Sequence, residues 1–249
     1  MAGEFEAEAA GLEWLAEGGV PVPEVLAVGS EPPLLALSWV EPGSLSATGA
    51  EDFGRGLAAL HALGAPAPGW IPGGAEAGVS DGAGTQWLGS LSLEVGPGEG
   101  WPEVYASQRL LPLARRCRDA GTLSAGGADA VEAVCERIGE LAGPPEPPAR
   151  LHGDLWGGNV LADEGGRGWL IDPSAHGGHR EMDLAMLRLF GNPGGERVFA
   201  AYEEALPLAE GAAGRVGLWQ LQPLLVHAAL FGGSYGASAE RTARSLLQH

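Results

Sequence analysis

Three polar residues in one short stretch of the chain carry the clearest chemical signal in this sequence. Asn159 follows Asp154 by five positions, and Asp172 follows Asp154 by 18 positions. Strand-like patterns at residues 160–161 and 169–171 predict a hairpin, which would bring Asn159 and Asp172 together where its strands meet the loop. Their amide and carboxylate oxygens suit Mg²⁺, a hard ion that keeps waters and shares phosphate oxygens. Asp154 remains free to accept a proton from a substrate hydroxyl, so the three residues predict a phosphoryl-transfer site.

Four residues around this triad have weaker chemical signals. His152 is expected to brace backbone carbonyls, because Asp154 already supplies the base. Asp183 stands at a predicted helix start, where it would cap the helix and accept hydrogen bonds from the backbone of the catalytic loop. Trp156 is expected either to stack on a sugar face or to fill the core. His227 lies on an otherwise apolar helix, and it would either be a core histidine or line an acceptor pocket.

The elements needed to position these residues form an α+β layout, with a little β structure first and mostly helix afterwards. Besides the hairpin, short extended segments are expected at residues 20–29 and 34–40. Residues 64–100 are rich in glycine and proline and are expected to be a long irregular insertion. Hydrophobic periodicity predicts helices at residues 4–17, 50–63, 101–120 and 127–142, from about 183 onward, and at 195–208, 215–231 and 237–247.

The composition excludes several classes of function. The net charge is −18, and all 14 basic residues are arginine. A protein this acidic repels a phosphate backbone, so nucleic acid is not an expected partner. The two cysteines, Cys117 and Cys135, are expected to be buried, reduced thiols. Neither a signal peptide nor an apolar run long enough for a membrane span is evident, which predicts a cytoplasmic protein.

Several motifs together resemble the fructosamine-3-kinase, or ketosamine kinase, family. The run His152-Gly153-Asp154-Leu155-Trp156-Gly157-Gly158-Asn159 is followed by Ile171-Asp172-Pro173 and by GHREMDLA at residues 178–185. A histidine-glycine-aspartate motif with a later asparagine and aspartate is shared with aminoglycoside and choline kinases. The tryptophan after the first motif, the GHRE run and LFGGSY at residues 230–235 narrow the resemblance to the ketosamine kinases.

This resemblance implies a protein-kinase-like two-lobed fold with a truncated small N-lobe at residues 1–41 and a mainly helical C-lobe at residues 42–249. Such enzymes use ATP and Mg²⁺ to phosphorylate a sugar hydroxyl of a ketosamine, either free or on a glycated protein amine. By the same resemblance Asp154 is the catalytic base, and Asn159 and Asp172 hold Mg²⁺. Glu8 would be the helix glutamate that pairs with a strand lysine. The hinge that binds the adenine would comprise Leu37, Ser38, Trp39, Val40 and Glu41.

The family pattern also implies a glycine-rich hairpin and a lysine-bearing strand before the first helix, roughly 40 residues that this sequence does not show. One interpretation is an intact enzyme whose natural start lies upstream. The other is a degenerate kinase or binding module that binds ATP weakly or not at all. A kinase of another small molecule, such as an aminoglycoside, is a further alternative. The sugar, the amine and the oligomeric state are left open by the sequence.

Overall fold

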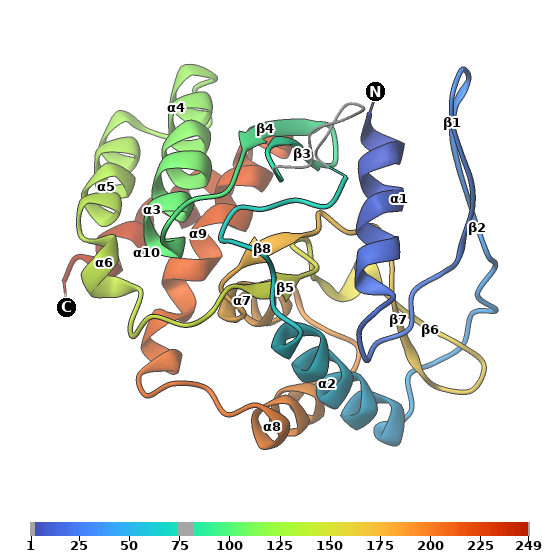
Figure 1. Ribbon diagram of the computed structural model, residues 1–249. Coiled ribbons are helices and arrows are strands. Elements are labelled where there is room, and N and C mark those ends of the chain that lie inside the picture. The colour runs from blue at the N-terminus through green and yellow to red at the C-terminus, as the bar shows by residue number, and fades with distance from the viewer. Residues whose placement is uncertain (1–2, 74–81, 249) are drawn as a thin grey trace.

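The computed structural model describes residues 3–73 and 82–248 and combines a helical body with short two-stranded sheets (Figure 1). The strands in the described residues are β1 (Val25–Ser30), β2 (Pro33–Leu37), β3 (Gly84–Leu88), β4 (Leu91–Val95), β5 (Ala149–Leu151), β6 (Val160–Ala162), β7 (Gly168–Leu170) and β8 (His176–Gly178). The helices there are α1 (Glu4–Leu15), α2 (Ala47–Ala62), α3 (Trp101–Tyr105), α4 (Leu111–Asp119), α5 (Ala125–Glu136), α6 (Ile138–Leu141), α7 (Glu181–Phe190), α8 (Glu196–Ala205), α9 (Ala212–Phe231) and α10 (Tyr235–Leu246).

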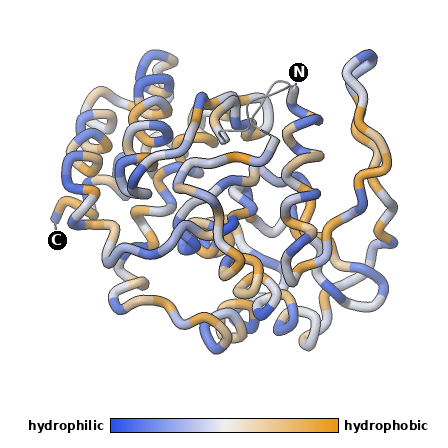
Figure 2. Tube along the Cα trace, viewed as in Figure 1, coloured by the Kyte–Doolittle hydropathy of each residue, from blue (hydrophilic) through white to orange (hydrophobic). Residues whose placement is uncertain are grey.

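The strands pair as antiparallel ribbons, β1 with β2, β3 with β4, β5 with β8 and β6 with β7. The β1–β2 ribbon stands to one side of the body in Figure 1, and Figure 2 shows hydrophobic residues along it. Leu26 and Val28 on β1 are 60% and 45% exposed. Within the described chain, no helix is both long enough and apolar enough to cross a membrane.

The expectation of an irregular insertion at residues 64–100 is wrong where β3 and β4 form a hairpin; residues 74–81 lie outside the described residues. The segments GTQWL and LSLEV pair from Gly84 with Val95 to Leu88 with Leu91. The two residues between them include Gly89, whose φ of 56° suits a tight hairpin turn. A high glycine content over the whole insertion hid this local alternation of buried and half-exposed residues.

Two other sequence expectations also need correction. The helix expected at residues 101–120 is interrupted by a π-helical turn, Ala106–Leu110, and the helix expected at 127–142 divides into α5 and α6. Strands β5 and β8 were not expected, because three residues are too few for a periodic pattern. They pair Ala149 with Gly178 and Leu151 with His176 across a gap in sequence that only the fold closes.

Two hydrophobic clusters make up the core of the described residues. One joins α3, α4, α5, α9 and α10 around residues such as Tyr105 and Trp219. The other joins α2, α7 and α8 and also takes in Leu15 and Val20 from the N-terminal part of the chain. Leu151 belongs to the first cluster and Leu155 to the second. The loop between these two leucines is therefore anchored at both ends in the hydrophobic core.

The domain boundary at residue 41 stays a prediction.

The start of α2 is tied to the turn between β6 and β7. The Ser46 hydroxyl accepts a hydrogen bond from the Gly49 amide at 2.9 Å and donates one to the Gly166 carbonyl at 3.2 Å. Because Gly49 has no side chain, the Gly166 carbonyl can come against the helix; a Cβ at residue 49 would overlap that oxygen. This close approach fixes the hairpin that carries Asn159 and Asp172 against α2.

We expect Gly49→Ala to destabilise the protein by about 1–3 kcal/mol, because the added methyl group forces the hairpin turn away from α2. Gly214→Ala on α9 is the matched control, since a Cβ there meets no atom within 4 Å. In an exposed helix that change should stabilise by about 0.5–1 kcal/mol. Urea unfolding of both variants measures the difference, and equal stabilities would contradict the proposed contact.

Candidate active site

The backbone that leads to Asp154 is fixed by the buried carboxylate of Asp183. Its Oδ2 accepts from the His152 amide at 2.8 Å, and its Oδ1 accepts from the Gly153 amide at 3.0 Å. Gly153 has a φ of 83°, and a Cβ there would overlap the Ser174 carbonyl oxygen. Burial alone would raise the pKa of Asp183, but the hydrogen bond from His61 and the other contacts lower it below its usual value. Asp183 therefore remains an acceptor for both loop amides.

His61 adds a third hydrogen bond to the same carboxylate. Its Nε2 lies 3.2 Å from Asp183 Oδ2 and its Nδ1 lies 2.8 Å from the Tyr202 hydroxyl. Because a carboxylate only accepts, Nε2 carries the proton and Nδ1 accepts from the hydroxyl. His61 is on α2 and Tyr202 is on α8, so this chain of contacts connects the catalytic loop to two helices.

His152 braces the other side of the loop. Its ring is fully buried, with Nε2 donating to the Ile171 carbonyl at 2.9 Å. Its Nδ1 accepts from the Asp154 amide at 3.3 Å. Burial lowers the pKa of His152, which keeps the ring neutral and makes this pair of contacts consistent. The histidine thereby links the loop to the end of β7.

Asn159 joins Asp154, the predicted base, to Asp172, a predicted magnesium ligand. Its Nδ2 donates to the Asp154 carbonyl at 2.8 Å, to Asp154 Oδ2 at 3.1 Å and to the Asp172 carbonyl at 3.4 Å. These contacts fix the orientation of the amide and leave its oxygen as an available ligand atom. Asp172 has a φ of 53°, which a non-glycine residue rarely adopts. Strained backbone of this kind is concentrated at functional sites.

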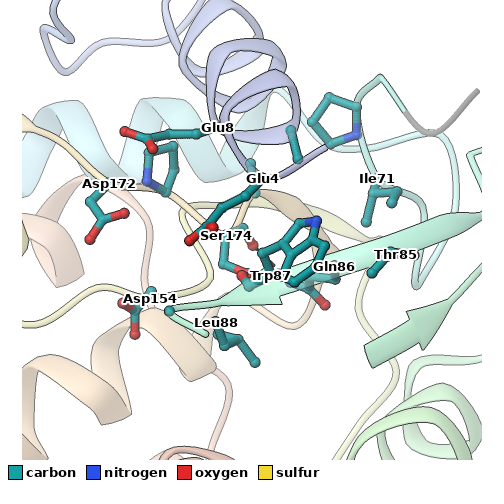
Figure 3. A pocket seen from close by; sticks show the side chains of 15 residues that line it. Glu4, Glu8, Ile71, Thr85, Gln86, Trp87, Leu88, Asp154, Asp172 and Ser174 are labelled. Atoms are coloured by element: carbon teal, nitrogen blue, oxygen red, sulfur yellow. Dashed lines mark hydrogen bonds between the residues drawn. The ribbon is translucent and has the colours of Figure 1, made fainter. Parts of the chain in front are cut away.

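Asp154 and Asp172 line one open cleft. Figure 3 shows their carboxylates beside Glu8 from α1 and Ser174, with β3 contributing Trp87 to the opposite wall. No sequence pattern predicted the β3 wall. Its only local signal was the alternation around a glycine turn, and no residue type in it points to chemistry.

The cleft is strongly acidic. Burial, together with the charge of Asp172, raises the pKa of Asp154 to about 7. Burial, Asp172 and Glu4 raise the pKa of Glu8 to about 7 as well. Since carboxylates dominate the cleft and the sequence contains no lysine, the site has a strong electrostatic preference for cations.

The predicted hinge lies outside this cleft, next to the β6–β7 turn. The Ser38 amide donates to the carbonyl of Glu24, the residue before β1, at 2.8 Å. The Glu41 carbonyl accepts from the Glu164 amide at 3.2 Å. Trp39 is 80% exposed, and its Nε1 donates to Glu41 Oε2 at 2.8 Å.

The two predicted substrate residues also lie outside the residues that line the cleft. Trp156, directly after the catalytic loop, is 41% exposed. His227 belongs to an aromatic group at the ends of α7 and α9 and the start of α10. Its ring centroid lies 4.3 Å from that of Phe190, 5.5 Å from Phe231 and 5.0 Å from Tyr235. His227 Nδ1 donates to the Pro223 carbonyl at 2.8 Å, which leaves Nε2 free of that bond.

Comparison with known proteins gives one consistent result. The family model for fructosamine kinase matches residues 1–249. "Probable ketoamine kinase TTHA1179" from Thermus thermophilus is 38% identical over 94% of this chain and 79% of its own length. A crystal structure from Thermobifida fusca, of a protein assigned as a fructosamine-3-kinase, is 46% identical, with a TM-score of 0.89 over 100% of this chain and 82% of that one.

A more distant structure supports the fold alone. Choline kinase LicA from Streptococcus pneumoniae is 16% identical to this chain, with a TM-score of 0.61 over 98% of this chain and 80% of that one. Together with the similarity to the Thermobifida structure, this confirms the predicted α+β, protein-kinase-like fold class.

We expect His61→Phe to destabilise the protein by about 1–3 kcal/mol, because it removes one of three hydrogen bonds to the buried Asp183 carboxylate and also the bond to the Tyr202 hydroxyl. His227→Phe is the matched control, since the hydrogen bond it removes is made within its own helix. The free energy of unfolding in urea measures both losses. Equal losses would show that the contact between α2 and the catalytic loop adds nothing to stability.

Proposed function

The chain belongs to the fructosamine kinase family, whose members are enzymes, and from that premise we propose that it transfers the γ-phosphate of ATP to a sugar hydroxyl of a ketosamine. The observation that carries this proposal is that Asp154 and Asp172 line one cleft, with the Asn159 amide hydrogen-bonded to the Asp154 carboxylate and to the Asp172 backbone carbonyl. Base, amide ligand and carboxylate ligand are the parts that phosphoryl transfer requires of a protein.

The residues present fit a magnesium ion bound together with nucleotide phosphates. Among residues 3–73 and 82–248, no group of three or more histidine, cysteine, aspartate or glutamate side chains is arranged to hold a metal. The arrangement that does occur is one amide oxygen, from Asn159, and one carboxylate, from Asp172. Mg²⁺ binds proteins through one or two such oxygens and completes its shell with water and phosphate. When bound, it supplies charge neutralisation for the transferring phosphoryl group.

Asp154 acts as the general base in this proposal. The substrate hydroxyl oxygen forms the new bond to the γ-phosphorus, the bond from that phosphorus to the β–γ bridging oxygen breaks, and the hydroxyl proton passes to Asp154. Asn159 holds one carboxylate oxygen of Asp154 through Nδ2, which leaves the other to face the hydroxyl. A pKa raised to about 7 places this base close to neutral pH, where a general base is most effective.

Nucleotide and acceptor are assigned to separate regions. The adenine would meet the hinge formed by residues 37–41, beside the β6–β7 turn. The acceptor would meet Trp156 and the aromatic group around His227. An exposed indole offers a flat face to a sugar ring, and His227 Nε2 offers a hydrogen bond to a hydroxyl. The ketosamine amine is cationic, which the acidic cleft favours.

One observation favours the alternative of a nucleotide-binding protein without turnover. Glu8, the predicted partner of a strand lysine, lies near Asp172 instead, and its pKa is raised by burial and then by that like charge. Measuring ATP·Mg²⁺ binding alongside turnover separates the two functions: binding without phosphorylation of any ketosamine would support the alternative. Phosphorylation of an aminoglycoside in place of a ketosamine would support a kinase of another substrate class.

We expect Asp154→Asn to lower kcat on a ketosamine such as fructosyl-lysine by about 10²–10⁴-fold, because the amide cannot accept the proton. The phosphorylated product is detected by mass spectrometry. For the unaltered enzyme, kcat/KM should fall as the pH drops below about 7, where Asp154 becomes protonated. Asp129→Asn, on the exposed side of α5, is the matched control and should retain full activity. Near wild-type turnover of Asp154→Asn would exclude it as the base.

The same variant has a second expected effect, on stability. The pKa of Asp154 is raised from 3.8 to about 7 in the folded protein, so the folded state binds more protons than the unfolded state between these values. The folded protein therefore loses stability as the pH rises from about 4 to 7. Asp154→Asn should be more stable than the wild type at pH 8 and nearly equal at pH 4. Thermal unfolding at both pH values checks this and shows that lost activity is not lost folding.

We expect Trp156→Ala to raise the KM for the ketosamine by about 2–10-fold, the loss of one aromatic contact, with the KM for ATP unchanged. Trp39→Ala, in the hinge, should leave the ketosamine KM at its wild-type value. Steady-state kinetics with each substrate varied in turn provides the measurement. An unchanged ketosamine KM in Trp156→Ala would place the acceptor elsewhere.

A further inference from the structure

Arg109 is a fully buried arginine that makes no hydrogen bond and has no carboxylate partner among the described residues. Its side chain has no solvent exposure, and neither Nε, Nη1 nor Nη2 makes a hydrogen bond in the described part of the chain. Buried arginines are almost always paired, because removing a guanidinium from water without compensation costs several kcal/mol. The position of Arg109 therefore requires a charge partner that the fold itself does not provide.

The local structure directs this side chain inward. Arg109 lies in the π-helical turn Ala106–Leu110, which joins α3 to α4. A π-helical turn shifts the register of the following residues, and such turns are frequent at functional sites. Tyr105, just before the turn, and Leu110, its last residue, are also fully buried. The regular α-helical geometry is therefore interrupted at Arg109, the residue whose charge lacks a partner.

The polar groups around Arg109 are buried, and several of them lack hydrogen-bond partners. The Arg109 guanidinium lies 5.2 Å from the ring centroid of Trp101, and the Trp101 ring stacks with that of His176. Trp101 Nε1 is a second buried donor with no partner, and His176 Nε2 and Gln86 Oε1 are also unpaired. Each of these side chains is at most 5% exposed. Three separate segments, β3, α3 and β8, therefore bring unpaired polar atoms to the same region.

The ionisable neighbours do not neutralise the charge. Burial lowers the pKa of Arg109 only to about 9, so the guanidinium is positive at neutral pH. Tyr105 is neutral, since burial raises its pKa, and its hydroxyl bonds the Leu218 carbonyl. Burial and the charge of Arg109 lower the pKa of His176 to about 3 and keep that ring neutral. No carboxylate is among the groups that shift the pKa of Arg109.

We propose that Arg109 and Trp101 form a binding site for a small monovalent anion of halide size, with chloride as the occupant under ordinary conditions. The excess of N–H donors and the uncompensated positive charge favour an anion over water alone. Because the surrounding side chains are at most 5% exposed, a larger ligand is not expected. A spherical anion can accept hydrogen bonds from the guanidinium and from the indole at the same time.

The site lies behind one wall of the catalytic cleft. Gln86 Nε2 donates to the Ser174 carbonyl at 2.8 Å, and both residues line the cleft with Asp154. Gln86 Nε2 also lies 2.9 Å from His176 Nδ1. A bound anion would therefore hold the β3–β4 hairpin to β8, next to the catalytic loop. This inference concerns binding and stability, and it stands whether or not the proposed kinase activity is correct.

Two measurements test the proposal on the complete protein. In crystals grown with sodium bromide, anomalous scattering should show a bromide peak beside the Arg109 guanidinium. In thermal unfolding at constant ionic strength, replacing gluconate with chloride should raise Tm. At a chloride concentration ten times Kd, the rise should be roughly 3–6 °C for a protein of this size.

Arg109→Met should abolish the chloride-specific rise, while Arg116→Met, an exposed arginine on α4, should retain it. If Arg109→Met does not fold, the two wild-type measurements still decide. Ordered waters at Arg109 without a bromide peak, together with equal Tm in chloride and gluconate, would overturn the proposal. A halide response that persists in Arg109→Met would place the anion at another site and would also overturn it.

Discussion

The rest of the catalytic region depends on one buried carboxylate. Asp183 accepts hydrogen bonds from two consecutive loop amides and lies within hydrogen-bonding distance of His61 Nε2. Burying a charge raises the free energy of the folded protein unless the charge is fully hydrogen-bonded. Removing any of its hydrogen-bond partners therefore destabilises the protein. The result is a rigid backbone immediately before Asp154. Helices α2, α7 and α8 all contribute to this arrangement, so the position of the base is a property of the whole helical body.

That rigidity allows the cleft to concentrate negative charge. Asp154 and Glu8 both have a pKa raised to about 7, and for both residues Asp172 contributes. Like charges held this close destabilise the folded protein at neutral pH, a cost that a loosely held loop would relieve by moving apart. In the proposed function, the same repulsion becomes affinity for a divalent cation and for a cationic acceptor. Stability and catalysis therefore make opposite demands on these carboxylates.

Arginine has two different roles in the interior of this protein. Arg215 is paired with Glu181 at 2.6 Å, and Arg180 with Glu146 at 2.7 Å, so each buried cation has its own carboxylate. Arg109 has none. Arg109 therefore differs from Arg215 and Arg180, because the fold provides a carboxylate for each of those two arginines and none for Arg109. An external anion at Arg109 would make the wall of the cleft dependent on a diffusible ligand.

The sequence by itself determined the features that depend on short separations. The spacing of Asp154, Asn159 and Asp172 around a hairpin predicted their grouping, because a hairpin brings its two ends together regardless of the surrounding fold. The long helices were also predicted, since an amphipathic period persists over many residues. The roles assigned to Trp156, His227 and residues 37–41 stay predictions.

Only the tertiary structure decided the contacts between distant segments. His61 meets Asp183 across 122 positions, and Gln86 meets Ser174 across 88. A buried histidine in a helix and a glutamine in a glycine-rich segment have no local pattern that names a partner. Arg109 is the clearest case, because at the sequence level it is one of 14 arginines in an acidic chain. Whether such a charge is solvated, paired or left without a partner is set by the packing around it, which no local sequence pattern encodes.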